Sequence, residues 1–333
     1  MRLVRQLGNS AIEVVDAPDP RPALGQVLIR TAVSAICGSE LHAYRTTGAG
    51  SGNGGHEAAG VVAALGEGVT ELEVGQRVGV SAIFGCGECE QCAQGRYTWC
   101  ERHGFTPNMH AELFVTPALA CHRLPDDVGW DDGVLITGDG LGVPFHTSQR
   151  LARFDIDTVA VFGLGPVGLG AVLLQSHLGR RVVGVDLSAD RVRLASELGA
   201  AGTILVTPEV DVPHAVREAF GGIGPDLCIE AAGSPITAQF CFDSVRTGGT
   251  VVFNGEQGSL PLSPSEDFIR RDITALGSWF YHFSEYPAML ELLRSGLAVS
   301  SLVTHHFPVS EADTAFRTMA GSTSGKVLLT YDP

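Results

Sequence analysis

Four cysteines lie within sixteen residues of this chain, in a spacing that suits a metal ion. The segment GCGECEQCAQGRYTWC, residues 85–100, contains them in the pattern C-x2-C-x2-C-x7-C: Cys86, Cys89, Cys92 and Cys100. The short steps place neighbouring sulfurs on one tight turn, and the longer step lets the chain return to close a tetrahedron. Four thiolates with no open coordination position are typical of structural zinc. We therefore predict a structural zinc lobe at residues 85–100.

The alternative for such a cluster is a set of disulfides, and the N-terminal sequence argues against it. MRLVRQLGNSAIEVVDAPDP has neither the apolar core nor the cleavage site of a signal peptide. No apolar stretch reaches the length that a membrane span needs. We therefore expect a cytoplasmic protein in a reducing compartment, where thiolate clusters more often bind metals than form disulfides.

A second group of metal-ligating residue types occurs earlier in the chain. The segment CGSELH contains Cys37, Ser39, Glu40 and His42, and GGHEAAG contains His56 and Glu57. A thiolate and an imidazole, each close to a carboxylate, suggest zinc ligands with supporting carboxylates. A catalytic zinc keeps three protein ligands and leaves one position for water or substrate.

The third ligand of this predicted site must come from elsewhere in the sequence. TGDGLGVPFHT offers Asp139, directly before a predicted helix. Glu57 and His146 are alternatives, and water could also complete the shell. The sequence alone leaves this choice open.

A glycine loop in the second half of the chain has the pattern G-x-G-x-x-G. Its residues follow the predicted strand TVAVF and open a predicted helix, which is the context that gives this weak motif its meaning. The glycines allow a tight turn, a close approach to a pyrophosphate and close packing of helix on strand, and the helix N-terminus offers free N–H groups. The predicted cofactor-binding residues of the loop are Gly163, Gly165, Pro166, Val167 and Gly168.

The next predicted strand, RVVGVD, ends at Asp186, eighteen residues past Gly168. A carboxylate at this place accepts hydrogen bonds from the ribose hydroxyls of the adenosine and repels a 2′-phosphate, which favours NAD over NADP. Arg191 also belongs to the predicted cofactor site, and a nearby arginine weakens that preference.

The elements that must position these residues change in character along the chain. Before about residue 155 the sequence has short β-branched runs broken by glycine, as in QVLIRTAVSAI. After it, strand and helix patterns alternate as far as ITALGSWF, which predicts an α/β fold with a parallel sheet covered on both faces. We expect the tail, which ends in the strand-like GKVLLTYDP, to return to the first domain.

Length and composition set the remaining limits. The chain has 333 residues, enough for two domains, and its 44% hydrophobic residues provide a large core. Its formal net charge of −15 makes nucleic acid and anionic membranes poor partners. We expect Cys121, Cys228 and Cys241 to lie in the core. The sequence leaves open whether Trp279, Phe280 and Tyr281 line a pocket or are buried.

These motifs together resemble the zinc-dependent medium-chain dehydrogenases/reductases, the family of alcohol and polyol dehydrogenases. CGSELH, GHE, the four-cysteine lobe, GLGPVG and Asp186 carry the resemblance, in that order along nearly the whole chain. It implies a GroES-like catalytic domain of residues 1–141 and 282–333, interrupted by a Rossmann domain of residues 142–281. It also implies one catalytic and one structural zinc, and a homodimer or homotetramer.

The resemblance also implies a role for each matching residue. Cys37 and His56 correspond to catalytic zinc ligands, and Asp139 to the third. Ser39 corresponds to the hydroxyl that contacts the substrate oxygen, and His42 to the outer member of a proton relay. Glu57 joins them in the predicted catalytic group, and both it and Glu40 support the zinc ligands. The segment between His42 and His56 is shorter than is usual for the family. In the family this segment helps to shape the substrate cleft, so the substrates of relatives are a weaker guide to the substrate of this chain.

The predicted activity is hydride transfer between NAD(H) and a secondary alcohol or ketone, with a polyol, sugar or cyclitol derivative as substrate. A reductase acting on an aldehyde, a ketone or an activated C=C bond is the enzymatic alternative. A non-catalytic protein that binds a cofactor is the remaining one, although Cys37, His56 and Asp139 are all present.

Overall fold

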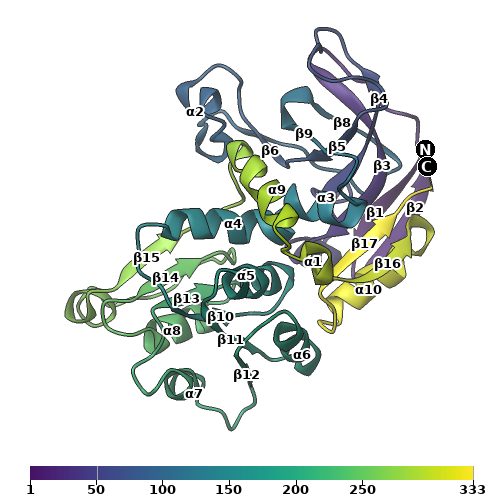
Figure 1. Ribbon diagram of the computed structural model, residues 1–333. Helices are drawn as coiled ribbons and strands as arrows, with labels where there is room; N and C mark the ends of the chain where they lie inside the picture. Colours follow the sequence, from purple (N-terminus) through teal and green to yellow (C-terminus); the bar gives the residue numbers. More distant parts are fainter. Residues whose placement is uncertain (51, 333) are drawn as a thin grey trace. The chain divides into compact units, whose positions relative to one another are not determined.

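The computed structural model describes residues 1–50 and 52–332 and divides into two compact units (Figure 1). The first unit comprises residues 1–142 and the chain from Phe280 onward, and the second comprises Val143–Trp279. The second unit is therefore inserted into the sequence of the first. These boundaries lie within two residues of the positions expected from the sequence.

The inserted unit contains a parallel sheet in the strand order β12-β11-β10-β13-β14-β15. The strands are short and almost free of charge because a parallel sheet is covered on both faces. The chain starts at β10, builds outward to β12, and then returns to the other side of β10 with β13. The bounds are β10 (Thr158–Phe162), β11 (Arg181–Asp186), β12 (Gly202–Leu205), β13 (Leu227–Glu230), β14 (Thr250–Phe253) and β15 (Thr274–Gly277).

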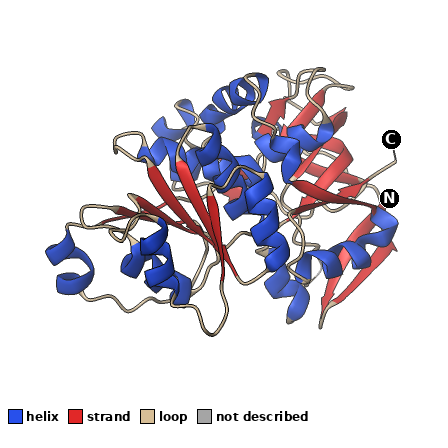
Figure 2. Cartoon of the chain, turned by 60° about the horizontal axis from the view of Figure 1, so that its bottom comes forward, coloured by secondary structure: helices blue, strands red, loops and turns tan. Residues whose placement is uncertain are grey.

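Helices alternate with these strands, and Figure 2 shows them beside the sheet. Their first residues carry ordinary start signals: Ser188, Asp211 and Ser234 accept hydrogen bonds from backbone N–H groups of the first turn. The bounds are α5 (Pro166–His177), α6 (Ala189–Glu197), α7 (Val212–Ala219) and α8 (Pro235–Ser244). The predicted alternation of strand and helix in this unit is thus confirmed.

The first unit is rich in β structure. Its main sheet has the order β16-β17-β3-β4-β5-β9, with β8 also paired to β3, while β1 pairs with β2 and β6 with β7. Strands β16 and β17 are parallel, and the other pairs are antiparallel. The bounds are β1 (Arg2–Gly8), β2 (Ala11–Asp16), β3 (Gln26–Ile36), β4 (Ala58–Leu65), β5 (Arg77–Val80), β6 (Ile83–Phe84), β7 (Gly104–Phe105), β8 (Leu113–Pro117), β9 (Cys121–Arg123), β16 (Val303–Pro308) and β17 (Lys326–Thr330).

The helices of the first unit are short. They are α1 (Glu40–Arg45), α2 (Glu90–Ala93), α3 (Trp130–Ile136), α9 (Tyr286–Arg294) and α10 (Ala312–Ala320). Helix α4 (Asp139–Leu151) begins in this unit and continues into the inserted one. Short helical turns complete the chain: η1 (Tyr97–Trp99), η2 (Ala118–Ala120), η3 (Pro264–Phe268), η4 (Ile269–Arg271), η5 (Phe283–Glu285), η6 (Val299–Leu302) and η7 (Val309–Glu311).

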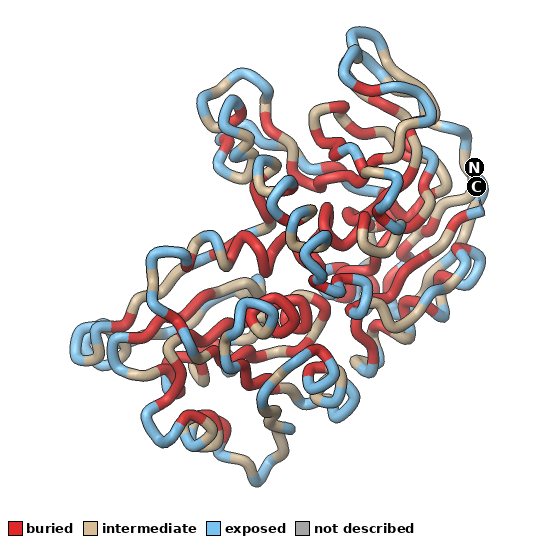
Figure 3. The backbone as a smooth tube through the Cα atoms, viewed as in Figure 1, coloured by how far each residue is buried: buried red, intermediate tan, exposed pale blue. Residues whose placement is uncertain are grey.

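Each unit has its own core, visible as buried stretches of the backbone in Figure 3. In the inserted unit Cys228 and Cys241 are completely buried among apolar side chains, as expected. In the first unit the last strand, β17, supplies Val327 and Leu329 to a core shared with Phe316. Strand β17 pairs with β3 from the start of the chain, so the tail does return to the first unit. No helix among the described residues is both long and apolar enough to cross a membrane.

Candidate active site

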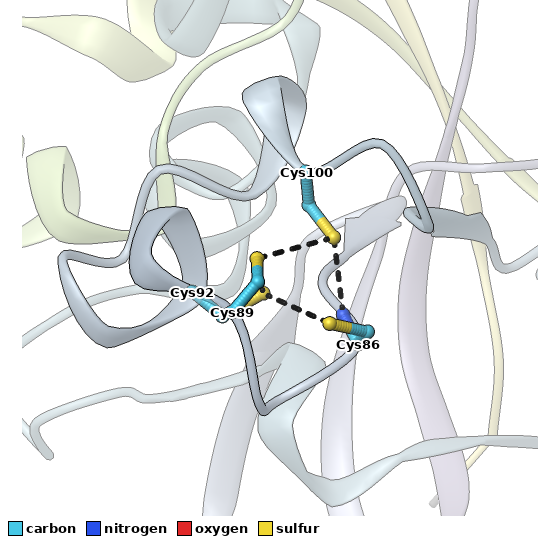
Figure 4. A group of neighbouring side chains, drawn as sticks. All are labelled: Cys86, Cys89, Cys92 and Cys100. Carbon is cyan, nitrogen blue, oxygen red and sulfur yellow. Dashed lines mark hydrogen bonds between the residues drawn. The ribbon is translucent and has the colours of Figure 1, made fainter.

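The four cysteines of the lobe converge, as Figure 4 shows. Cys89 Sγ lies 3.5 Å from Cys92 Sγ and 3.8 Å from Cys100 Sγ, and Cys86 Sγ lies 3.9 Å from Cys92 Sγ. Sulfurs around a tetrahedral zinc, at bonds of about 2.3 Å, are about 3.8 Å apart. These sulfur distances, and the convergence of all four thiols, therefore suit a structural zinc ion.

The thiols of the lobe differ in pKa: burial raises the pKa of Cys92 to about 11, whereas the pKa of Cys86 is lowered. Backbone N–H groups, first that of Glu88, donate to Cys86 and lower the pKa of its thiol to about 6. Arg102 Nη2 donates to the same sulfur over 3.2 Å. Cys86 is therefore held as a thiolate near neutral pH, which is the form that binds metals.

The lobe also holds the segment that follows the inserted unit. Gly95 O accepts a backbone hydrogen bond from Ser284 over 3.1 Å, and Thr98 Oγ1 lies 2.9 Å from His282 Nδ1. The ring of Tyr97 stacks on Phe283 with centroids 4.9 Å apart. The cysteine lobe therefore fixes the point where the chain re-enters the first unit.

A second group of metal-ligating side chains gathers in the first unit: Cys37, His56, Glu57 and Asp139. Asp139 Oδ2 lies 3.3 Å from Cys37 Sγ and 3.2 Å from His56 Nε2. Ligand atoms around a tetrahedral zinc, at bonds of about 2.0–2.3 Å, are about 3.3–3.8 Å apart. Asp139 therefore lies at the spacing of a zinc ligand from both Cys37 and His56.

The sheet of the first unit positions two of these ligands. Cys37 directly follows β3 and His56 directly precedes β4, and the two strands pair antiparallel. Asp139 is the first residue of α4. His56 Nδ1 lies 3.0 Å from Gly54 O, so the Nδ1–H donates to that carbonyl and Nε2 is left for a metal.

The charges of this buried group suit a bound cation. Cys37, His56, Glu57 and Asp139 are all buried, and Asp139 Oδ1 has no hydrogen-bond partner among the described residues. Burial, followed by the negative charge of Asp139, raises the pKa of Cys37. Ionised Cys37, Glu57 and Asp139 would carry three negative charges, which the nearby Lys326 offsets by one. A divalent cation would bring the group to neutrality, so the residues fit a catalytic zinc.

Two of the alternatives for the third ligand can be compared with Asp139. Lys326 Nζ donates to Glu57 Oε1, and Glu57 Oε2 accepts from the backbone N–H of Asp139 over 2.9 Å. Both oxygens of Glu57 are therefore used to hold Asp139 and to balance charge. His146 lies further along α4, in the inserted unit, and is not part of the four-residue group.

The residues predicted for proton transfer closely follow Cys37 in the sequence and are exposed. Ser39 is the residue before α1, its side chain does not cap the helix, and it is exposed, as is His42. Two phenylalanines also border the group: the rings of Phe105 and Phe280 lie 5.8 Å and 6.2 Å from that of His56, and 6.3 Å from each other. Of the three aromatic residues at 279–281, Tyr281 is buried and donates to Thr137 O.

The glycine loop lies between β10 and α5, as its motif predicts. Gly163 has φ +87°, and a Cβ there would meet Ala232 at 2.7 Å, while a Cβ on Gly168 would meet Gly163 O at 1.8 Å. Both positions therefore exclude side chains. At Gly165 the nearest atom to an added Cβ is Arg191 Nη1 at 3.9 Å, so the loop leaves space where a pyrophosphate would lie.

Asp186 ends β11 and holds the loop in place. Its Oδ2 accepts from the N–H of Leu164 over 2.6 Å, and its Oδ1 accepts from the N–H of Ser188 over 2.8 Å. Each oxygen keeps a lone pair for a ribose hydroxyl. Arg191, in the first turn of α6, extends its guanidinium toward Gly165.

Sequence reasoning missed several residues around the metal group. It did not identify Lys326, nor His110, which lies 2.9 Å from Glu40, nor Phe105. A lysine in GKVLLTYDP and a histidine in NMHAEL have no spacing signal. Only the pairing of strands distant in sequence brings them to the site.

Comparison with known proteins agrees with this geometry. Residues 23–126 match the alcohol dehydrogenase GroES-like domain, and residues 166–295 match the zinc-binding dehydrogenase domain. The L-threonine 3-dehydrogenase of Chromobacterium violaceum is 31% identical over 96% of both chains. Two solved structures are also similar. The alcohol dehydrogenase TADH from Thermus sp. ATN1 is 28% identical with a TM-score of 0.88, covering 100% of both chains. The 2R,3R-butanediol dehydrogenase from Bacillus subtilis is 26% identical with a TM-score of 0.83, covering 99% of both.

The chain belongs to the zinc-dependent medium-chain dehydrogenases of the alcohol dehydrogenase type. It is an oxidoreductase with a GroES-like and a Rossmann-type unit, as the sequence predicted.

Proposed function

We propose that this protein oxidises a secondary alcohol with NAD and catalyses the reverse reduction of the ketone, with a polyol, sugar or cyclitol derivative as substrate. The observation that carries the proposal is the group of Cys37, His56 and Asp139, whose spacing and charge suit a zinc ion with an open position. L-Threonine and 2,3-butanediol, named in two relatives, both have a secondary hydroxyl, which supports this class of substrate.

In this proposal a zinc ion held by Cys37, His56 and Asp139 supplies Lewis-acid chemistry at the substrate oxygen. Ser39 accepts the hydroxyl proton at Oγ as it gives up its own proton, which His42, three residues further along, passes to solvent. NAD held at the glycine loop and Asp186 would supply the acceptor for the hydride of the hydroxyl-bearing carbon. The products are a ketone, NADH and a proton, so atoms and electrons balance.

The preference for NAD rests on Asp186. Its two oxygens are aimed at the glycine loop and the following turn, where a ribose would present its hydroxyls. Arg191 reaches toward the loop at Gly165, so in this proposal it assists the pyrophosphate.

The test is a spectrophotometric screen that follows the near-ultraviolet absorbance of reduced nicotinamide. Protein of measured zinc content is assayed with polyols, sugars, cyclitols, simple secondary alcohols and L-threonine, each with NAD and with NADP. Turnover of neutral secondary alcohols with NAD is expected. Ser39→Ala should lower kcat by about a hundredfold or more. Asp186→Ser should reduce the NAD preference, while Asp190→Ser, an exposed change on α6, should leave it unchanged.

Silence in zinc-replete protein across this panel would contradict the proposal. The same protein would then be assayed with NADH and carbonyl or enone substrates, which tests the reductase alternative.

A further inference from the structure

Two buried carboxylates hold the backbone of two predicted metal ligands in the same way. Glu57 accepts the N–H of Asp139 over 2.9 Å, and Glu40 Oε1 accepts the N–H of Cys37 over 2.8 Å. Glu57 has its second partner in Lys326. The groups that hold the carboxylate of Glu40 in place therefore also fix the position of the Cys37 backbone.

Glu40 is held by a buried histidine. Its Oε2 lies 2.9 Å from His110 Nε2 and 3.2 Å from Gln6 Nε2. His110 is completely buried, and its ring meets the edge of Phe316 with centroids 5.8 Å apart. The ring has little freedom to turn, so its Nε2 stays directed at the carboxylate.

The hydrogen-bonded chain continues to the last residues of the described sequence. His110 Nδ1 lies 2.8 Å from Ser34 Oγ, which lies 2.9 Å from Tyr331 Oη. Ser34 is on β3 and Tyr331 directly follows β17, whose backbone pairs with β3. Burial raises the pKa of Tyr331, so its phenol keeps its proton and donates.

If all the hydrogen bonds of this series are donated in the same direction, every group in it has a hydrogen-bond partner. Tyr331 O–H donates to Ser34, Ser34 O–H donates to His110 Nδ1, and His110 Nε2–H donates to Glu40, which accepts the N–H of Cys37. Bonds that share a direction strengthen one another, and a buried group that loses its partner is costly. This series of hydrogen bonds therefore links Tyr331 to Cys37, a predicted metal ligand.

We propose that His110, Ser34 and Tyr331 are positioning residues that act through Glu40 to hold Cys37 where it binds the catalytic metal. This inference rests on the metal site of the proposed function. It assigns a role at that site to the last part of the chain, in addition to the one that Lys326 has through Glu57. Its alternative is a polar cluster that stabilises the fold without affecting the metal.

The experiment measures how fast zinc leaves the catalytic site of the full-length protein when a chelator is added. Cys37→Ser identifies the phase of zinc release that belongs to this site, because the cysteine lobe keeps its own ion. His110→Phe should release catalytic zinc about tenfold faster, and Ser34→Ala and Tyr331→Phe about threefold faster. The cobalt-substituted protein gives an independent reading, since displacement of Cys37 shifts its thiolate-to-cobalt absorption band.

Matched controls separate positioning from loss of stability. Thr31→Val removes a buried hydroxyl on the same strand as Ser34, which bonds Ala111 O. Tyr286→Phe removes a buried phenol that bonds Arg123 O. Neither hydroxyl is connected to Glu40, so both variants should release zinc at the wild-type rate. Tyr331→Phe and Ser34→Ala remove single hydroxyls and keep the test valid if His110→Phe does not fold.

A double variant tests whether the residues act in series. If they do, Tyr331→Phe adds nothing in a His110→Phe background, since the link to Glu40 is already broken. Release of zinc from Tyr331→Phe and Ser34→Ala at the rate of the two controls would overturn the proposal, as would full additivity. If wild-type protein holds no more zinc than Cys37→Ser, the metal site of the proposed function has failed, and this appears before any other variant is compared.

Discussion

At the scale of single residues, charge balance decides what the buried group in the first unit can be. Cys37, Glu57 and Asp139 lie together out of solvent, with Lys326 as the nearby cation. Burying these three groups in ionised form beside one lysine is unfavourable unless a further positive charge is present, which a metal ion or a protonated His56 supplies. The carboxylates that flank Cys37 and His56 in the sequence predicted that these two residues belong to one group, and the sequence offered Asp139 beside Glu57, His146 and water as the third ligand. It could not predict Lys326, since no local pattern links a residue to one 269 positions away.

The first prediction concerns the third metal ligand. Asp139→Asn keeps the shape of the side chain and removes its charge, so the affinity of the catalytic site for zinc should fall at least about tenfold. Zinc content after dialysis should drop to that of the cysteine lobe alone, and turnover should be lost. Metal analysis of the purified variant checks this, with the exposed Asp127→Asn as control. Undiminished zinc in Asp139→Asn would show that Glu57 or water completes the shell instead.

The second prediction concerns the buried pair of Lys326 and Glu57, which are both fully buried. Lys326→Met leaves the carboxylate of Glu57 without its cation. The free energy of unfolding of the first unit should therefore fall by about 3–5 kcal/mol. Adding Glu57→Gln removes the uncompensated charge and should restore part of that loss. Denaturant unfolding of the zinc-loaded proteins measures both. Equal stability of the single and double variants would mean that the charge of Glu57 was not the cause.

At the scale of elements, strand β9 packs an uncharged histidine against the segment that re-enters the first unit. The ring of His122 stacks on Phe283 at 3.9 Å and on Tyr286 at 4.4 Å between centroids. His122 is buried, and its Nε2 has no hydrogen-bond partner among the described residues. Burial lowers the pKa of His122 to about 3. The stack therefore depends on a neutral ring.

This depressed pKa predicts a dependence of stability on pH. The unfolded chain binds a proton at His122 below about pH 6.5 and the folded chain does not, so stability is lost as the pH falls from about 6.5 toward 3. His122→Phe keeps the stack and removes the titration. Between about pH 7.5 and about pH 5, the wild type should lose about 2 kcal/mol more than the variant.

Thermal or denaturant unfolding at the two pH values measures this difference. His214→Phe, which changes an exposed histidine, should follow the wild type. Parallel loss of stability in wild type and His122→Phe would show that His122 is not buried and neutral in solution.

Element by element, the inserted unit was predictable and the first unit was less so. In the inserted unit each apolar run such as TVAVF is a strand, and each following capped segment is a helix, because local sequence and sheet position agree. In the first unit the order β16-β17-β3 joins the two ends of the chain. Contacts such as Ser34 with Tyr331 exist only after that pairing, so composition and spacing cannot reveal them.

At the scale of the whole molecule, one unit is continuous in sequence and the other is not. The inserted unit has its own core and complete parallel sheet within Val143–Trp279. The first unit needs β17 to complete the sheet beside β3. The two units should therefore differ in whether they fold alone.

We predict that residues 143–279, expressed alone, fold and bind NADH through the glycine loop. Residues 1–142 alone should fail to form a cooperative structure, because the edge of β3 and the carboxylate of Glu57 lose their partners. Circular dichroism with thermal melting tests folding, and the fluorescence of NADH tests binding. A cooperative transition in the 1–142 fragment would show that the last strand is not needed for this unit.

The position of β17 has a consequence for how the protein is made. A ribosome releases Cys37, His56 and Asp139 long before Lys326 and Tyr331. During synthesis Glu57 therefore lacks its cation Lys326, and Cys37 lacks the support that reaches it from Tyr331. The cysteine lobe is complete in sequence as soon as residue 100 emerges. The nascent chain would then capture metal in two stages, with the lobe loaded early and the catalytic ion admitted only after Lys326 and Tyr331 have emerged.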